Sequence, residues 1–349
     1  MIEHIHISND EETKRWDQFV ERHSASTPFH LASWIRTIED TYSFKPYLCV
    51  YKENGGDISG IFPYFSVKGL WGKPRLVSIP FSDYGGPLFV DGNDEEKVIR
   101  DLVENHSEKI GAIEIRKNIE NDCHLVCHNY FRRHLLSLSD DPDDVYRKIN
   151  KRTIKYSIRK ATKANVQIKE NSSQDGLQAF IRLNYLTRKK HGVPVQPDSF
   201  FKNLFDNMVQ NGQAHILQAE YDSKIIASSF FITFKDTVYY KYSASDPAFI
   251  RSKNPNHLLT WCAIKKACLE GYRYFDFGRT SPDNVGLMRY KEMWGTEHYD
   301  CCYFYYPEIN GATSMGENSR LYKTITSIWT RLPDPVTKIL GPMICRYTA

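Results

Sequence analysis

The chain has 349 residues, of which 41% are hydrophobic and 25% charged, and its formal net charge is +4. This is the composition of a globular protein, and the length favours two domains of ordinary size. So small a positive charge does not by itself indicate a nucleic-acid partner, no apolar run is long enough to cross a bilayer, and eight scattered cysteines fit a reducing cytoplasm better than a secreted disulfide framework.

Residues 1–139 predict a first α/β domain. The polar, acidic start predicts no signal peptide, and Asn9 or Asp10 can cap a first helix whose Trp16 and Val20 share one face. Alternating and helical apolar patterns predict the other elements: strands at 2–7, 46–52, 58–67, 112–116 and 135–138, a strand, turn and strand over 75–90, and helices from 27 and over 95–111.

Two short motifs in this first domain could carry chemistry. Asp83 and Tyr84 precede Gly85-Gly86, where the backbone either makes a plain turn or approaches a ligand closely. The set Cys123, His124, Cys127 and His128 has paired i, i+4 ligands but not the spacing of a standard zinc site. We therefore predict no metal site.

A second domain is expected over residues 140–312. Ser139-Asp140-Asp141-Pro142 is a strong helix start, and we place the domain boundary there. The helix that follows, Asp143 to Lys163, holds the strongest basic cluster in the chain. This cluster is either a solvated helix face or a surface for the phosphates of a nucleotide, a tRNA or an anionic lipid carrier.

The second domain repeats the order of elements of the first. Helical patterns are expected over 175–193 and from 197, then strands over 214–221, 224–234 and 237–243, and a helix from about 255. In both halves an aromatic helix leads into a hairpin, which predicts a duplicated α/β unit with mixed sheets. The helix that opens after the polar turn Arg251 to Asn256 offers a site for an anion.

The stretch 274–297 carries the most information. Tyr274, Phe275 and Phe277 predict a short strand around Asp276, Gly278 a sharp turn, and 279–284 a polar loop before a short helix that Gly295 ends. On that helix Leu287, Tyr290 and Trp294 share an apolar sector that also includes Lys291. Such a lysine either extends to water or presents its charge to an anion or oxyanion.

After these elements, the tail over 313–349 has apolar residues at helical spacing, interrupted by Pro333 and Pro335. We expect an accessory helical tail that packs on a domain, with contact to a membrane surface as the alternative. Nucleophile-elbow, P-loop, metalloprotease and Rossmann motifs are absent from the sequence, which removes support for hydrolases, kinases and dehydrogenases.

The sequence resembles the FemAB family of peptidyl and acyl transferases, in particular the exopolysaccharide-associated branch built from two tandem GNAT-like domains. The resemblance covers essentially the whole chain, and its most specific part is FDFGRTSPDNVGLMRYKEMWGTE at 275–297. The other matching segments are Thr27-Pro28-Phe29 with Trp34, SIPFSDYGGPLF at 78–89, the basic run 151–168 and the tail segment 330–342.

This resemblance implies transfer of an acyl or aminoacyl group to an amine of a cell-envelope, peptidoglycan or polysaccharide precursor, at the cytoplasmic side of the membrane. By similarity, Lys291 beside Tyr290 would stabilise the oxyanion, Asp83 would orient or deprotonate the amine, and Arg279 would hold an anionic part of the acceptor. Further substrate contacts are expected from nearby motif residues: Asp276, Tyr84, Trp294, Arg251 and Asn256.

The expected donor is an aminoacyl-tRNA or an acyl-CoA acting as co-substrate, with no tightly bound cofactor. GNAT enzymes that use acetyl-CoA hold its pyrophosphate in a glycine-rich loop, but both glycine positions are asparagine here and Pro255 removes an amide donor. This departure favours an aminoacyl-tRNA or another activated donor. The alternatives are an acyl-CoA-dependent N-acyltransferase and a non-catalytic module that binds tRNA or an anionic carrier, and the sequence does not set the oligomeric state.

Overall fold

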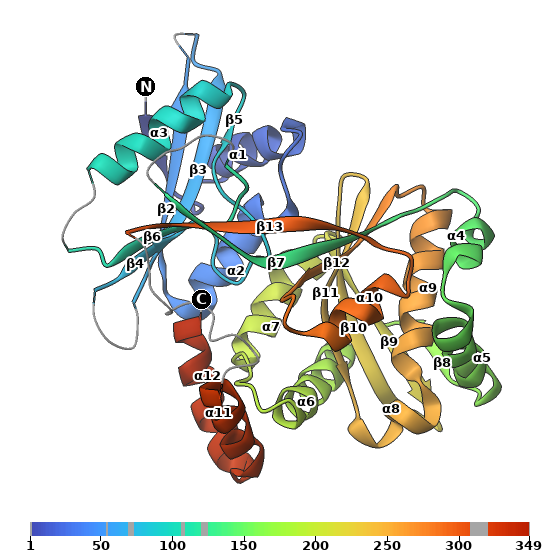
Figure 1. The fold of residues 1–349 in the computed structure, drawn as a ribbon. Coiled ribbons are helices and arrows are strands. Elements are labelled where there is room, and N and C mark those ends of the chain that lie inside the picture. The colour runs from blue at the N-terminus through green and yellow to red at the C-terminus, as the bar shows by residue number, and fades with distance from the viewer. Residues whose placement is uncertain are drawn as a thin grey trace. The chain divides into compact units, whose positions relative to one another are not determined.

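The computed structural model describes residues 2–53, 55–68, 73–105, 109–119, 125–307 and 320–348. The chain folds into two compact units (Figure 1). The N-terminal unit contains Met1–Phe131, Asp300–Ser314 and Arg346–Ala349, and the C-terminal unit contains Arg132–Tyr299 and Met315–Cys345. These limits differ from the expected boundaries at 139 and 312, because residues of one late strand pair inside the N-terminal unit.

The N-terminal unit is a mixed sheet with the strand order β1-β2-β3-β4-β6-β13, and β5 pairs with β3. Its pairs are antiparallel apart from β4 and β6, which run parallel. The strands are β1 (Ile2–Ile5), β2 (Lys45–Lys52), β3 (Ile58–Val67), β4 (Arg75–Val77), β5 (Leu88–Phe89), β6 (Ala112–Ile115) and β13 (Glu297–Tyr306). The helices are α1 (Asp10–Arg22), α2 (Ala32–Tyr42) and α3 (Gly92–Glu104).

Local sequence signals explain how this unit begins. The side chain of Asn9 accepts hydrogen bonds from the amides of Glu11 and Glu12 and so caps α1, as expected. Trp16 and Val20 lie on the buried face of that helix. A 3-10 turn, Pro28–His30, comes before α2, so the helix expected from Thr27 starts five residues later, at Ala32.

The C-terminal unit has the strand order β7-β12-β11-β10-β9-β8. The strands are β7 (Val126–Ser137), which enters this unit at Arg132, β8 (Gln167–Glu170), β9 (Ala214–Tyr221), β10 (Lys224–Phe234), β11 (Thr237–Ser245) and β12 (Tyr274–Thr280). The helices are α4 (Pro142–Lys148), α5 (Tyr156–Lys163), α6 (Gln174–Lys190), α7 (Asp198–Leu204), α8 (Pro247–Lys253), α9 (Pro255–Leu269), α10 (Val285–Glu292), α11 (Arg320–Arg331) and α12 (Asp334–Cys345).

The predicted hairpin of this unit is confirmed. Asp222 and Ser223 both have positive φ, 50° and 58°, as a two-residue turn between twisted strands requires. In contrast, the single helix expected over 143–163 is divided. Asp141 caps α4, and the helix ends at Ile149, whose backbone is extended. Asn150 then caps the wide helical turn Lys151–Lys155 that leads into α5.

Candidate active site

A cavity lies where two parallel strands of the C-terminal unit stop pairing. β11 and β12 pair only over Thr237–Tyr239 and Tyr274–Asp276. Beyond that point β11 stays paired with β10, and β12 continues beside β7. The cavity next to this opening has a volume of about 340 Å³.

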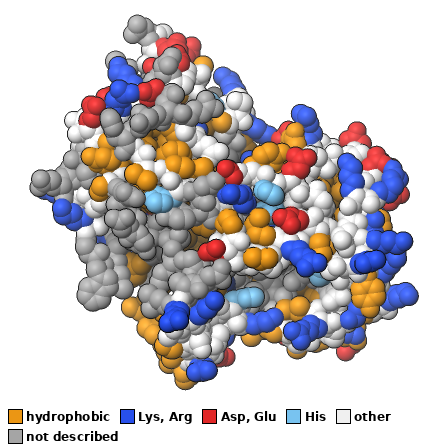
Figure 2. All heavy atoms as spheres, in the orientation of Figure 1, with side chains coloured by type: hydrophobic (Ala, Val, Ile, Leu, Met, Phe, Trp, Pro, Cys, Tyr) orange, Lys and Arg blue, Asp and Glu red, His pale blue; other side chains and the backbone are white. Residues whose placement is uncertain are grey.

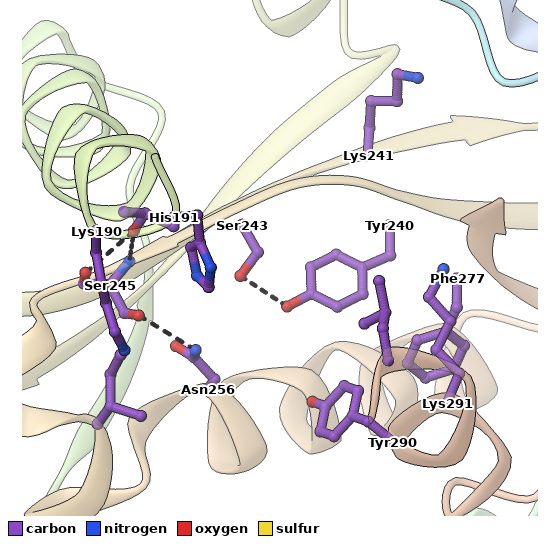
Figure 3. A pocket seen from close by; sticks show the side chains of 13 residues that line it. Lys190, His191, Tyr240, Lys241, Ser243, Ser245, Asn256, Phe277, Tyr290 and Lys291 are labelled. Atoms are coloured by element: carbon purple, nitrogen blue, oxygen red, sulfur yellow. Dashed lines mark hydrogen bonds between the residues drawn. The ribbon is translucent and has the colours of Figure 1, made fainter. Parts of the chain in front are cut away.

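Side chains from four parts of the unit line this cavity (Figure 3). They come from the end of α6, from β11 and β12, from α8 and the start of α9, and from α10: Thr187, Lys190, His191, Tyr240, Lys241, Ser243, Ser245, Ile250, Asn256, Phe277, Leu287, Tyr290 and Lys291. The described lining thus holds three lysines and no carboxylate. It favours a substrate group that is anionic or becomes so during reaction.

Lys291 is held in the wall of the cavity by backbone carbonyls. Its side chain is buried, with 6% exposed, and Nζ donates to the carbonyls of Gly278 and Arg279 at 3.0 and 3.1 Å. Asn284 caps α10 by accepting from the amide of Leu287 at 3.1 Å, which fixes the start of the helix that carries the lysine. The expected ammonium in an apolar sector is therefore present and oriented.

A β-bulge on β12 places the two carbonyls that hold Lys291. The register of β12 against β7 shifts between Asp276 and Arg279, and Gly278 has a φ of +68°. The expected sharp turn at Gly278 is thus a bulge inside a strand that continues to Thr280. The guanidinium of Arg279 is half-buried on this strand, and its contact with an acceptor stays a prediction.

Asp276 supports the bulge instead of lining the cavity. Its carboxylate is buried, receives Nε of Arg133 at 2.8 Å and accepts from the amide of Gly278 at 2.7 Å. Both carboxylate oxygens thus accept hydrogen bonds inside the protein, which gives Asp276 a positioning role, and its expected contact with substrate stays a prediction. The short aromatic strand pattern gave no sign of Arg133, which lies on β7.

Tyr290 and His134 show how strongly the surroundings of Lys291 are desolvated. Burial, together with nearby Tyr240, raises the pKa of the Tyr290 phenol, so the group stays a neutral hydroxyl. Burial, followed by the charge of Lys291, lowers the pKa of His134 to about 4. Tyr290 lines the cavity as expected, and its ring meets that of His257 at 5.6 Å.

A second bulge brings together side chains that the sequence did not single out. The register of β10 against β11 shifts between Phe230 and Phe231, which leaves Lys241 as the extra residue. Tyr240 and Ser243, which a regular strand would point to opposite faces, therefore share a face, and the Tyr240 hydroxyl donates to Ser243 Oγ at 2.9 Å (Figure 3). No local sequence signal marks this bulge.

Asn256 reaches the cavity from the first turn of α9. Its Nδ2 donates to Ser245 Oγ at 3.3 Å, while its Oδ1 is buried with no hydrogen-bond partner. Asn256 thus offers an acceptor to a ligand, in line with its expected role. Arg251 lies on the exposed end of α8 and is not among the residues that line the cavity.

The segment before α9 is helical, which differs from the expected polar turn. The amide of Asn254 bonds to the carbonyl of Ile250 at 3.1 Å, Asn254 has a φ of 50°, and Pro255 follows at the first helical position. The Asn254 amide is therefore used inside α8 and Pro255 has none, which removes two backbone donors that could surround a pyrophosphate here.

Three expected site residues lie elsewhere. Trp294 has no exposed surface and packs in the core with Phe277, and its expected contact with substrate stays a prediction. Asp83 and Tyr84 belong to the N-terminal unit, where the Asp83 carbonyl accepts from Tyr303 Oη at 2.7 Å. Their meeting with Lys291 stays a prediction.

The four cysteine and histidine residues weighed as metal ligands lie on β7 or precede it in the sequence. Cys127 and His128 are neighbours on β7, whereas Cys123 and His124 lie outside the described residues. Within the described ranges, no three His, Cys, Asp or Glu side chains are grouped so as to hold a metal ion.

Comparisons with known proteins place the cavity in a recognised domain. The family model "Acetyltransferase (GNAT) domain" matches residues 148–292. The lipid II:glycine glycyltransferases of Staphylococcus haemolyticus and of Staphylococcus aureus strain bovine RF122 / ET3-1 are 21% and 22% identical to the chain, over 97% of this chain and 98% of each relative.

Solved structures agree in fold. FemX has a TM-score of 0.66 at 16% sequence identity, and the match covers 93% of this chain and 100% of FemX. A tandem GNAT protein from the clavulanic acid biosynthesis pathway has a TM-score of 0.56 at 11% sequence identity, and the match covers 87% of this chain and 97% of that protein. The resemblance to the FemAB family is confirmed: the chain is FemAB-like, has a mixed α/β fold of the GNAT type, and is an acyltransferase.

Proposed function

We propose that this FemAB-like acyltransferase moves an aminoacyl group from an aminoacyl-tRNA to an amine of a lipid-linked cell-envelope precursor at the cytoplasmic face of the membrane. The observation that carries the proposal is a buried ammonium, Lys291, facing a cavity whose described lining has no carboxylate. The relatives named lipid II:glycine glycyltransferases support a lipid-linked acceptor.

The chemistry follows from the position of Lys291. The neutral acceptor amine adds to the ester carbonyl of the donor and forms a C–N bond, and the carbonyl oxygen becomes an oxyanion. A cation in a desolvated wall stabilises that charge more than it stabilises the neutral ester. The amine loses a proton to a base, for which Asp83 is our candidate. The intermediate then collapses by breaking the ester C–O bond, and the protonated base returns the proton to the ribose oxygen, which leaves as a hydroxyl.

The local structure supports aminoacyl-tRNA over acyl-CoA as the donor. At the start of α9 the Asn254 amide is bonded to the Ile250 carbonyl of α8 and Pro255 has no amide to donate, so two backbone donors that could hold a pyrophosphate are lost. The basic residues of α4, α5 and the turn between them are largely exposed, and phosphates of an RNA acceptor stem would neutralise their charge: Arg147, Lys148, Lys151, Arg152, Arg159 and Lys163.

The test is acyl transfer to a panel of amine acceptors with charged tRNA or acyl-CoA as donor. Lys291→Ala is compared with Arg289→Ala, which removes an exposed cation from the same helix. We expect product from charged tRNA, a loss of roughly 10²- to 10³-fold with Lys291→Ala, and little change with Arg289→Ala. Product from acyl-CoA alone would overturn the donor assignment, and equal rates for the two variants would overturn the role of Lys291.

The basic surface of α4 and α5 allows tRNA binding to be measured apart from acyl transfer. We expect that binding to be salt-sensitive and to be unchanged by Lys291→Ala. Filter binding at 50 and 300 mM salt, run beside the transfer assay, separates loss of binding from loss of catalysis.

A further inference from the structure

The C-terminal helices α11 and α12 form a hairpin that is anchored on α6. Lys189 Nζ donates to the carbonyl of Trp329 at 3.3 Å and to that of Leu332, so a lysine of α6 satisfies the C-terminal end of α11. Tyr185 Oη and Thr337 Oγ1 share a hydrogen bond of 2.9 Å. The hairpin is therefore a fixed part of the C-terminal unit.

The inner face of α12 is made of small and polar residues at a spacing of four. Thr337, Gly341 and Cys345 are buried along this line. A Cβ on Gly341 would come within 3.0 Å of the Val195 side chain and 3.2 Å of its backbone, so the glycine permits close packing. This side of the helix carries the contacts that hold it in place.

The outer face of α12 is apolar and exposed. Its residues recur at i, i+3, i+4, i+7 and i+8, which is one helical face. They are Val336, Ile339, Leu340, Met343 and Ile344, with exposed fractions of 36%, 66%, 37%, 59% and 38%. On α11, Ile325 and Ile328 are 44% and 55% exposed. We call these seven residues the outer apolar face.

Cations flank this face. At about 100° per residue, Arg320 and Arg331 lie roughly 60–80° beyond Ile328 on α11, both exposed. Among the described residues 320–345, Lys323 and Lys338 are also basic, and Asp334 alone is acidic and pairs with Lys189 at 3.8 Å. Figure 2 shows hydrophobic and basic side chains together at the position of these helices in Figure 1.

We propose that the outer apolar face of α11 and α12 docks on an anionic lipid bilayer, with its side chains at the headgroup boundary and the arginines on lipid phosphates. An apolar stripe beside cations complements an anionic membrane surface, whereas a second copy of the chain would bring like charges together. The hairpin lies on the bilayer, because no described helix is long and apolar enough to cross one.

The test is co-sedimentation of the full chain with vesicles of phosphatidylcholine alone or with 30% phosphatidylglycerol. We expect binding to the anionic vesicles, a loss of roughly tenfold or more with Ile339→Ser/Met343→Ser, and a loss on the order of tenfold with Arg320→Gln/Arg331→Gln. The matched control is Leu269→Ser, which removes a side chain that is 67% exposed at the end of α9 in the same unit.

Each outcome decides the proposal. Binding retained by Leu269→Ser and lost by Ile339→Ser/Met343→Ser at an unchanged melting temperature supports it. Equal vesicle binding by the wild type and both double variants overturns it. A second outcome also overturns it: the wild type binds no vesicles, self-associates in sedimentation velocity, and loses that self-association with Ile339→Ser/Met343→Ser. The assay needs no acyl transfer, so its result is independent of the proposed function.

Discussion

The two units end their parallel strand pairs in opposite ways. In the C-terminal unit the pairing of β11 with β12 stops and a cavity follows. In the N-terminal unit β4 and β6 pair in parallel from Arg75 with Ala112 to Val77 with Glu114, and the space beyond is filled. The two units thus share a short parallel strand pair and differ in what lies beyond it.

A buried arginine fills the N-terminal opening. Arg116 is 4% exposed, its Nε donates to Glu114 at 2.8 Å, and its Nη1 donates to the carbonyls of Ile79 and Ser82, both at 3.2 Å. Lys291 likewise donates to two carbonyls beyond a strand pair, but it also lines a cavity. Removing a buried cation from its buried carboxylate partner destabilises a fold, whereas a buried cation that faces a cavity can act on a ligand.

The largest effect should come from breaking the N-terminal ion pair. Arg116→Leu leaves Glu114 buried with only the partly exposed Arg75, at 3.0 Å, as its remaining cation. We expect a loss of about 3–5 kcal/mol in unfolding free energy, measured by urea denaturation. Arg116→Leu/Glu114→Leu should recover part of this loss, and an unchanged urea midpoint for Arg116→Leu would show that the pair is not structural.

The matching change in the C-terminal unit should affect activity and leave stability nearly unchanged. Lys291→Met keeps the length of the side chain and removes the cost of a buried charge, so we expect unfolding free energy to change by less than about 1.5 kcal/mol. Acyl transfer should fall roughly 10²- to 10³-fold, a barrier increase of about 3–4 kcal/mol. A large loss of unfolding free energy would instead mean that Lys291, like Arg116, has a structural role.

Local signals explain what the sequence could predict. The cap at Asn9, the turn at Asp222-Ser223 and the position of Lys291 depend on neighbouring residues, and the structure confirms them. The contrast between the units depends on long-range contacts: Arg116 reads as an ordinary strand end, and its burial requires the loop after β4. The bulge at Lys241 likewise follows from pairing with β10, so Tyr240 and Ser243 gave no signal.

Acid should lower the stability of the N-terminal unit through protonation of His30. Its ring is 1% exposed, Nδ1 accepts from the Thr27 amide at 3.1 Å, and Nε2 lies 3.0 Å from the Gly86 carbonyl in the loop that follows Asp83. Burial lowers the pKa of His30 to about 4. The folded state therefore binds fewer protons than the unfolded state, and stability that is complete above pH 6.5 is lost as the pH falls toward 4.

The size of this loss is up to about 3 kcal/mol for His30 alone. Burial also lowers the pKa of His134 and His257 in the C-terminal unit to about 4, so the test is a difference between proteins. Urea midpoints of the wild type and His30→Gln, measured from pH 7.5 to 4.5, should show a shallower decline in the variant. Parallel curves would mean that His30 does not titrate with unfolding.

The smallest effect should come from the open cavity's polar wall. The Tyr240 hydroxyl donates to Ser243 Oγ and receives Thr260 Oγ1 at 3.4 Å. Tyr240→Phe removes both of these neutral hydrogen bonds and keeps the ring. If Tyr240 helps to hold the donor, KM should rise roughly fivefold, about 1 kcal/mol, with kcat unchanged. Tyr242→Phe, whose ring packs against Phe201 at 5.4 Å outside the cavity lining, should leave both constants unchanged. A fall in kcat with constant KM would mean that Tyr240 stabilises the transition state and does not hold the donor. The bulge at Lys241 would then be part of the catalytic machinery beside Lys291.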